Sequence, residues 1–147
     1  KPGDIPGPPG IYLLDVIPDG EVRFGFPNIN DNAEIAELIA CGSQVILFIT
    51  GRGSVVGSAI APVIKVCANP GTYQRMPGDM DINACRALED GVSLDQVGEE
   101  VCKHIVDVAS GRRTCSEALG HQEFALTYKT FEPSGPSCFP AAPVGPP

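Results

Sequence analysis

The feature that most constrains the fold is a short apolar run, Val45–Ile49, that ends in a glycine-rich loop. The run is rich in β-branched residues and has no polar interruption, which is typical of a strand buried on both faces of an α/β sheet. The loop that follows, residues 50–58, carries three glycines, one arginine and several hydroxyl groups. Open α/β sheets bind ligands at the carboxyl ends of their strands, where this loop begins. The run and its loop therefore predict a strand and a candidate binding site together.

Two further strands are expected at Ile11–Ile17 and Pro62–Cys67. A helix over Ala33–Cys41 falls between the first strand and the second, and this compact order favours a right-handed crossover with parallel strands. The other expected elements are a helix opened by the capping box of Ser93 and Gln96, a short helix at Thr114–Leu119 and a last strand at Glu123–Tyr128. We therefore expect an α/β fold, a three-layer Rossmann-like domain with a mostly parallel sheet.

The composition along the chain divides it into three parts. Residues 1–10 are dense in proline and glycine and are expected to be a linker from an upstream domain. Residues 11–131 carry the α/β pattern, and residues 132–147 form a second Pro/Gly-rich stretch, expected to be a tail. The chain opens on Lys-Pro-Gly-Asp rather than Met. We therefore expect the C-terminal piece of a larger polypeptide.

The net charge limits the possible binding partners of the chain, and the cysteine spacing indicates the redox state of its cellular compartment. The net charge of −8 argues against nucleic acid and anionic membranes as partners. The six cysteines are scattered and form no CxxC pattern, so they are expected to be reduced thiols and not metal ligands. Free thiols favour a reducing, cytoplasmic location.

The glycine-rich loop predicts an anion site. Arg52 offers a planar fork that suits a carboxylate, phosphate or sulfonate, and the glycines bring backbone N–H groups close to a ligand. Lys65 interrupts the third strand and Asn69 follows it. Together with Arg52 and Arg75, Lys65 suggests an anion clamp. A plain connector with a solvated arginine, and a lysine whose charge reaches water, are the alternatives. The candidate residues of the loop are Thr50, Gly51, Arg52, Gly53 and Ser54.

Acidic residues and histidines give weaker indications. Asp79 and Asp81 alternate, so both carboxylates face one way in an extended segment and suit a divalent cation. The alternative is that Asp81 caps the turn after it and the other carboxylate is solvated. Asp15 ends the first expected strand and either faces substrate or accepts a hydrogen bond in a turn. His104 is expected to be solvated, and His121, in a loop, is a conceivable base.

Short motifs along residues 8–124 stand in an informative order. They are Gly10–Asp15, Thr50–Ser54, Pro62–Lys65, Asn69, Tyr73–Asn83, Gly98–Glu100, Ala109–Thr114, Ser116–Glu117 and Leu119–Gly120. As a set they resemble the C-terminal region of the altronate/galactarate dehydratase family. The ending, at Gly120–Phe124 and Tyr128–Pro133, departs from the sugar-acid dehydratases and favours a related branch that eliminates sulfite from sulfolactate.

The resemblance implies a lyase of the cytoplasm. Its members eliminate water or sulfite from small hydroxy-acids such as altronate, galactarate or sulfolactate, with Fe²⁺ or a similar divalent metal. It implies that Asp79, Asp81 or Asn83 orients substrate or metal, and that the remaining metal ligands and the base lie upstream. The implied partners are an upstream domain or a small subunit, in an oligomer, so the fragment alone is expected to be inactive. The alternative is a non-catalytic α/β module for docking and oligomerisation.

Overall fold

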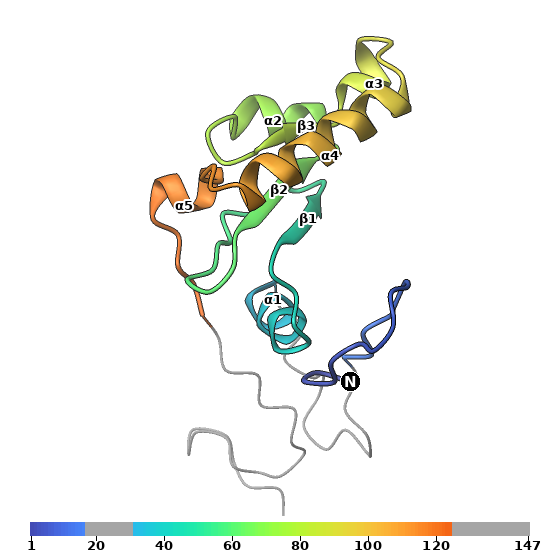
Figure 1. Ribbon diagram of the computed structural model, residues 1–147. Helices are drawn as coiled ribbons and strands as arrows, with labels where there is room; N and C mark the ends of the chain where they lie inside the picture. Colours follow the sequence, from blue (N-terminus) through green and yellow to red (C-terminus); the bar gives the residue numbers. More distant parts are fainter. Residues whose placement is uncertain (17–30, 125–147) are drawn as a thin grey trace, which may run out of the picture.

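The computed structural model describes residues 1–16 and 31–124 (Figure 1). In this part of the chain, helices surround a three-stranded parallel sheet, which is consistent with the predicted α/β fold. The strands are β1 (Ile46–Thr50), β2 (Val63–Cys67) and β3 (Ile82–Asn83). The helices are α1 (Asp31–Ala40), α2 (Pro70–Arg75), α3 (Arg86–Glu89), α4 (Leu94–Ala109) and α5 (Cys115–Leu119).

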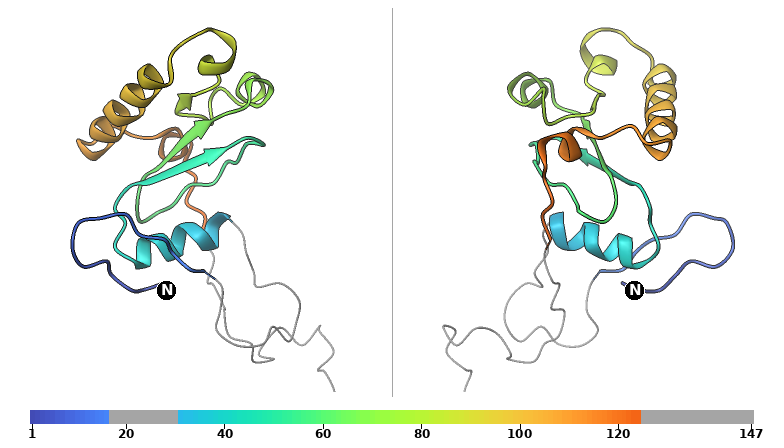
Figure 2. Two further views of the ribbon diagram at one scale, coloured as in Figure 1. Left: turned by 90° about the vertical axis from the view of Figure 1, so that its right-hand side faces the viewer. Right: turned by 60° about the vertical axis from the view of Figure 1, so that its left-hand side comes forward.

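The sheet has the order β1-β2-β3, and both strand pairs are parallel. Thr50 pairs with Cys67, and Cys67 pairs with Asn83, so the last residues of the three strands lie in one row. The connection from β1 to β2, residues 51–62, contains no helix or strand. It runs back along the side of the sheet that faces α1 (Figure 2).

Two buried clusters lie on opposite faces of the sheet. The face toward α1 contains Ile35, Ile46, Val56 and Val63. The face toward α4 contains Ile64, Val66, Ile82 and Val108. Helices therefore cover both faces, which is the layered arrangement expected of a parallel sheet. A third cluster, at the carboxyl end of β2, joins Cys67 to Met80 and Cys85.

The prediction that both faces of the first apolar run are buried is wrong for β1. Leu47 and Ile49 expose 39% and 68% of their surface, whereas Ile46 exposes 4%. The cause is position, because β1 stands at an edge of the described sheet and pairs with β2 alone. β2, between two neighbours, is buried at all five positions.

The prediction of a strand at Ile11–Ile17 is also wrong over its described part. Residues 11–16 form no strand, and Ile11 and Leu13 are almost fully exposed. Instead, the segment is folded back on the N-terminus, where Lys1 Nζ lies 2.9 Å from Asp15 Oδ2. The expected strand at Glu123–Tyr128 begins without strand structure at residues 123–124, and its remaining residues lie outside the described part.

The helix predictions are confirmed where local signals support them. Ser93 and Gln96 form the expected capping box at the start of α4. Thr114 and Glu117 form a second one at the start of α5. In both, a side chain satisfies a backbone N–H that the first helical turn leaves unpaired.

All five cysteines within the described residues are free, as expected. We predict that thiol titration of the denatured, unreduced protein gives close to six equivalents, the full number in the sequence. In the native state Cys102, which is exposed, is expected to react before the buried Cys67 and Cys85. Two or fewer thiols in the denatured protein would contradict the prediction.

Candidate functional site

The carboxyl ends of the strands bring together most of the predicted loop. Because the three strands end in register, the segment that starts at Thr50 and the segment that starts at Asn69 leave the same edge of the sheet. Asn69 caps α2, since its side-chain oxygen accepts a hydrogen bond from the N–H of Thr72. Asn83, at the end of β3, accepts one from the N–H of Cys85. We call this row of strand ends the carboxyl edge.

The loop after β1 is held against α2 at this edge. The hydroxyl of Thr72 donates to the carbonyl of Gly51 at 2.8 Å, and the N–H of Gly53 donates to Thr50 Oγ1 at 3.0 Å. Gly53 has φ +91°, and a Cβ there would lie 2.7 Å from Met76 Sδ. The backbone conformation therefore favours glycine at this position. Ser54 is tied to α1 by a hydrogen bond to Asp31.

Two arginines stand at the carboxyl edge. Arg75, in the last turn of α2, donates to the Thr72 hydroxyl, the same group that holds Gly51. Arg52 lies in the loop, is exposed, and forms no hydrogen bond or ion pair within residues 1–16 and 31–124. Two guanidinium groups at one edge of a sheet suit a small organic anion.

Asp81 belongs to a different place, in the interior beside β2. Its side chain is 2% exposed. One carboxylate oxygen accepts the N–H of Lys65 at 2.8 Å, and the other accepts the N–H of Cys115 at 2.8 Å. Burial and the Asp81 carboxylate raise the pKa of the Cys115 thiol to about 11. Asp81 thus joins β2 to the start of α5.

His104 lies beside the same carboxylate, and the prediction that it is solvated is wrong. It is 7% exposed, and its Nε2 lies 3.7 Å from Asp81 Oδ1. The helical pattern places it beside Val97, Val101 and Val108 on the face of α4 that packs on the sheet. The charged residues near His104 in the sequence therefore wrongly indicated a solvent-exposed position.

Lys65 is fully buried, at 0% exposure, in the middle of β2. Its Nζ has no hydrogen-bond partner among the described residues. Burial lowers the pKa of Lys65, and the negative charges of Asp79, Asp81 and Glu123 oppose this only in part. Lys65 therefore does not reach water, which removes the alternative of a solvated lysine.

Glu123 connects the end of the described chain to the loop between β1 and β2. Its carboxylate accepts the N–H of Gly57 at 2.9 Å and contacts His121 Nδ1 at 3.1 Å. Burial raises the pKa of Glu123, but the Gly57 N–H and His121 outweigh it, so the pKa lies below its ordinary value. A Cβ on Gly57 would lie 2.4 Å from the carbonyl oxygen of His121, so only glycine allows this contact.

The predicted site residues thus fall into separate groups. The carboxyl edge holds the loop from Thr50 to Ser54, together with Asn69 and Asn83. The interior group around Lys65 holds Asp79 and Asp81, and the structure adds Glu123 and His104, which the sequence pattern did not indicate. Asp15 is in neither group. Its carboxylate pairs with the side chain of Lys1, and the carbonyl of Lys1 accepts a hydrogen bond from Cys41 Sγ, just after α1.

The described residues do not fit the divalent metal that the resemblance implies. Within residues 1–16 and 31–124, no three His, Cys, Asp or Glu side chains are grouped so that they can hold a metal ion. Both oxygens of Asp81 accept backbone hydrogen bonds, and Asp79 and Asp81 are part of no such group among the described residues. The same part of the chain has no helix long and apolar enough to cross a membrane.

The sequence matches the family described as D-galactarate/altronate dehydratase, C-terminal, over residues 1–131. It is 34% identical over 125 residues to the (2R)-sulfolactate sulfo-lyase subunit beta of Chromohalobacter salexigens, covering 84% of this chain and 29% of the relative. It is 35% identical over 97 residues to the altronate dehydratase of Bacillus subtilis, covering 66% and 19%.

The galactarate dehydratase (L-threo-forming) of Escherichia coli is 36% identical over 90 residues, covering 60% of this chain and 17% of the relative. The chain thus spans less than a third of the length of the relatives that it matches. Each of these relatives is named as a lyase or a dehydratase, and the family match covers most of the chain. This chain therefore belongs to the C-terminal family of the D-galactarate/altronate dehydratases.

Proposed function

We propose that the chain is the C-terminal domain of a lyase that eliminates water or sulfite from a small hydroxy-acid. The observation that carries this proposal is the carboxyl edge, where the exposed Arg52 lies in a loop that a hydrogen bond fixes to α2. Open parallel sheets bind their ligands at this edge. The family match supports the reaction class, because the relatives are named as altronate dehydratase, galactarate dehydratase and sulfolactate sulfo-lyase.

The proposed role of the carboxyl edge is to hold the acid group of the substrate. Arg52 and Arg75 supply the positive charges, while Thr50, Asn69 and the loop backbone supply neutral donors. Elimination removes the proton next to the carboxylate, so negative charge grows on the carboxylate oxygens as the reaction proceeds. Donors that are fixed before the reaction stabilise this charge most effectively. Fixation here comes from the Thr72 hydrogen bond to Gly51.

We propose further that any divalent metal of the complete enzyme takes its ligands from residues other than those described here. Two observations support this: residues 1–16 and 31–124 hold no group of three side chains suited to a metal ion, and Asp81 accepts two backbone N–H groups. When bound, such a metal supplies Lewis-acid stabilisation of the same growing charge. The residues of this chain would then contribute binding and orientation of the acid group.

Replacing Arg52 with lysine in the complete polypeptide tests the proposal. The positive charge remains but the two-pronged geometry is lost, so we expect kcat/KM to fall by about 100-fold, or ~2.7 kcal/mol of transition-state stabilisation. The assay measures elimination from altronate, galactarate and sulfolactate, and a thermal melt checks the fold. A folded variant within about twofold of the wild type, ~0.4 kcal/mol, contradicts the proposal.

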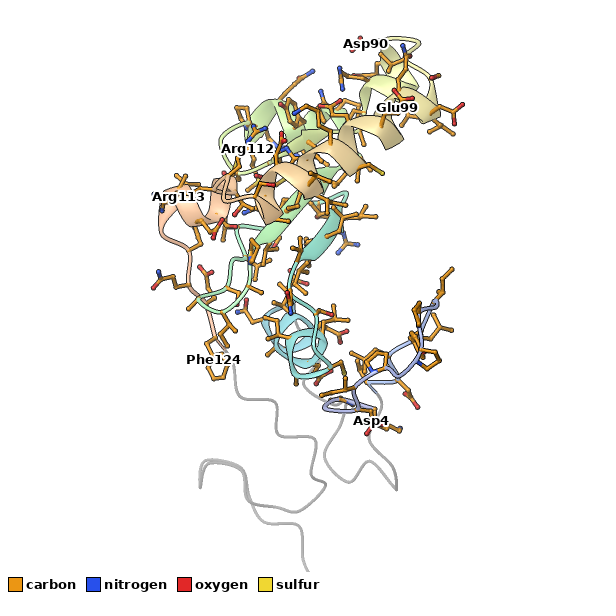
Figure 3. All side chains as sticks on the ribbon, in the orientation of Figure 1. Asp4, Asp90, Glu99, Arg112, Arg113 and Phe124 are labelled. Carbon is orange, nitrogen blue, oxygen red and sulfur yellow. The ribbon has the colours of Figure 1, made fainter. Side chains whose placement is uncertain are left out.

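Arg112→Lys is the matched control for this experiment. Arg112 lies at the junction of α4 and α5 (Figure 3), where it forms an exposed ion pair with Asp107. Exposed ion pairs contribute about 0–1 kcal/mol to stability, and this one is not part of the carboxyl edge. The control variant is expected to keep the activity and the melting temperature of the wild type.

The exposed apolar side of β1 supports a second candidate function, a docking module. Leu47 and Ile49 are exposed on an edge strand, and Val106 of α4 exposes 63% of its surface. The proposed occupant is the remaining part of the same polypeptide, because the chain spans at most 29% of the length of its relatives. If Arg52→Lys keeps full activity, this second function is the better account of the domain.

A further inference from the structure

Packing alone does not explain why a lysine stands at position 65. The residue is 0% exposed, and its Nζ lacks a hydrogen-bond partner among the described residues. A buried ammonium without a partner opposes folding, so a purely structural position would favour methionine or leucine. A lysine held in such a place is a candidate for chemistry that needs an amine.

The groups that face Lys65 come from each segment packed around it. Asp79 and Asp81 come from the connection between α2 and β3, Cys115 begins α5, and Glu123 lies near the end of the described chain. The negative charges of Asp79, Asp81 and Glu123 favour the ammonium, but burial is the larger effect and the pKa of Lys65 is lowered. A lysine in this state loses its proton more readily than one in water.

The side chain of Lys65 shares the face of the sheet on which the loop between β1 and β2 runs. Its neighbours Ile64 and Val66 face α4, and side chains alternate along a strand, so Lys65 faces the other side. Figure 2 shows residues 51–62 passing along that side. The loop thus starts at the carboxyl edge with Arg52 and continues to Gly57, whose N–H binds Glu123, one of the charges that face Lys65.

We propose that Lys65 is the proton acceptor of the elimination, a role that rests on the function proposed above. The neutral amine takes the proton from the carbon next to the carboxylate, and a new N–H bond replaces the C–H bond. The freed electron pair forms the carbon–carbon double bond while the C–O or C–S bond breaks. The leaving group departs as sulfite, or as hydroxide, which becomes water when the proton taken up by Lys65 is released to solvent.

Two features of the surroundings fit this role. Asp79 and Glu123 are partly exposed and face Lys65, so they offer the ammonium a route for returning its proton to solvent. Because Lys65 is fully buried, residues 55–62, beyond the part of the loop that is fixed to α2, have to move for substrate to reach the amine, and the hydrogen bond from Gly57 to Glu123 is the contact that breaks. Gly53, with φ +91°, permits a backbone conformation near the start of the loop that other residues rarely adopt.

The first experiment measures the protonation of Lys65 in this chain. The sequence holds four lysines, so the side-chain nitrogen signals are few enough to resolve by NMR, and Lys65→Met assigns the one of interest. We expect Lys65 to lose its proton at a lower pH than the other three lysines. A titration of Lys65 together with the exposed Lys103 would overturn the proposal.

Stability against pH gives a readout that does not depend on activity. Because the pKa of Lys65 is lowered by folding, the unfolded chain binds more protons, and stability rises with pH through the interval between the two pKa values. Lys65→Met is therefore expected to raise Tm at pH values below that interval, and the gain should vanish above the ordinary pKa of lysine. Lys103→Met is the control and should show no such gain, because Lys103 is exposed. A Lys65→Met variant that melts lower than the wild type at neutral pH would overturn the proposal.

The second experiment uses the complete polypeptide with the three hydroxy-acids. Lys65→Ala is expected to lose at least about 100-fold in kcat, the usual range for general-base catalysis, with little change in KM. Small primary amines added to Lys65→Ala should restore part of the rate, and the restored rate should follow the basicity of the amine. A structural role would not give rescue of this kind.

Three results separate the possible failures. If Lys65→Ala stays within tenfold of an active wild type, the role of Lys65 falls and the proposed lyase function stands. If Lys65→Ala is folded and inactive but no amine rescues it, proton transfer by Lys65 is also overturned. If the wild type eliminates nothing from any of the three acids, the proposed function fails and the role of Lys65 fails with it.

Discussion

Replacing Asp81 with alanine is expected to destabilise the protein by about 4 kcal/mol. The carboxylate of Asp81 is 2% exposed and accepts the backbone N–H groups of Lys65 and Cys115. Without it, two buried donors lose their acceptors, and each such loss costs about 1–3 kcal/mol. His104 Nε2, at 3.7 Å from Asp81, loses its nearest negative charge as well. Urea unfolding followed by circular dichroism at neutral pH measures the effect.

Two further variants sharpen this test. Asp81→Asn keeps one carbonyl acceptor but turns an NH₂ group toward the other backbone N–H, so about half of the loss is expected. Asp90→Ala is the control, since Asp90 is exposed at the end of α3 and a surface substitution changes stability by roughly 0.5 kcal/mol or less. If Asp81→Ala is no less stable than Asp90→Ala, the structural role given to Asp81 is wrong.

The sequence predicts elements best where the signal is local. The capping box of Ser93 and Gln96 needs only two residues three positions apart, and α4 begins where that pair places it. The apolar run at Val45–Ile49 likewise locates β1 to within a residue. The same run does not tell which strand stands at the edge, because apolar composition does not specify what covers a face. Leu47 and Ile49 are therefore exposed despite their hydrophobicity.

The segment around Ile11 shows the same limit in a stronger form. A short apolar run favours a strand, but a strand also needs a neighbour to pair its backbone. Residues 11–16 form no strand, and the ion pair between Lys1 and Asp15 joins the segment to the N-terminus. Local pattern alone contains no information about that pairing.

The candidate site was predictable only in part for a related reason. The expected strands at Val45–Ile49 and Pro62–Cys67 place Thr50 and Asn69 at one edge of the sheet, whereas β3, which ends at Asn83, was not among the expected strands. The group around Lys65 depends on contacts between distant positions. The Cys115 N–H reaches Asp81 across 34 positions, and the Gly57 N–H reaches Glu123 across 66. No spacing rule connects such residues, so Glu123 and His104 were missed.

Gly57→Ala is expected to destabilise the protein by about 3 kcal/mol. A Cβ at this position would lie 2.4 Å from the His121 carbonyl oxygen and 2.9 Å from the His121 Cβ. The backbone of residue 121 must then move away, which breaks the hydrogen bond from the Gly57 N–H to Glu123. Overpacking of this kind costs about 1–3 kcal/mol, and the lost charge-assisted hydrogen bond adds roughly 1.5–3 kcal/mol. Urea unfolding measures the loss of stability.

A second measurement shows whether the loss arises at this contact. The Gly57 N–H and His121 hold the pKa of Glu123 below its ordinary value, so the substitution should raise that pKa toward the ordinary one. NMR titration of the Glu123 carboxyl group detects the change. Gly78→Ala is the matched control, because a Cβ there meets no atom within 4 Å and its φ is not in the left-handed region. If Gly57→Ala behaves like Gly78→Ala in both measurements, residues 121–123 do not fix the loop between β1 and β2, and Lys65 is not covered in the way proposed.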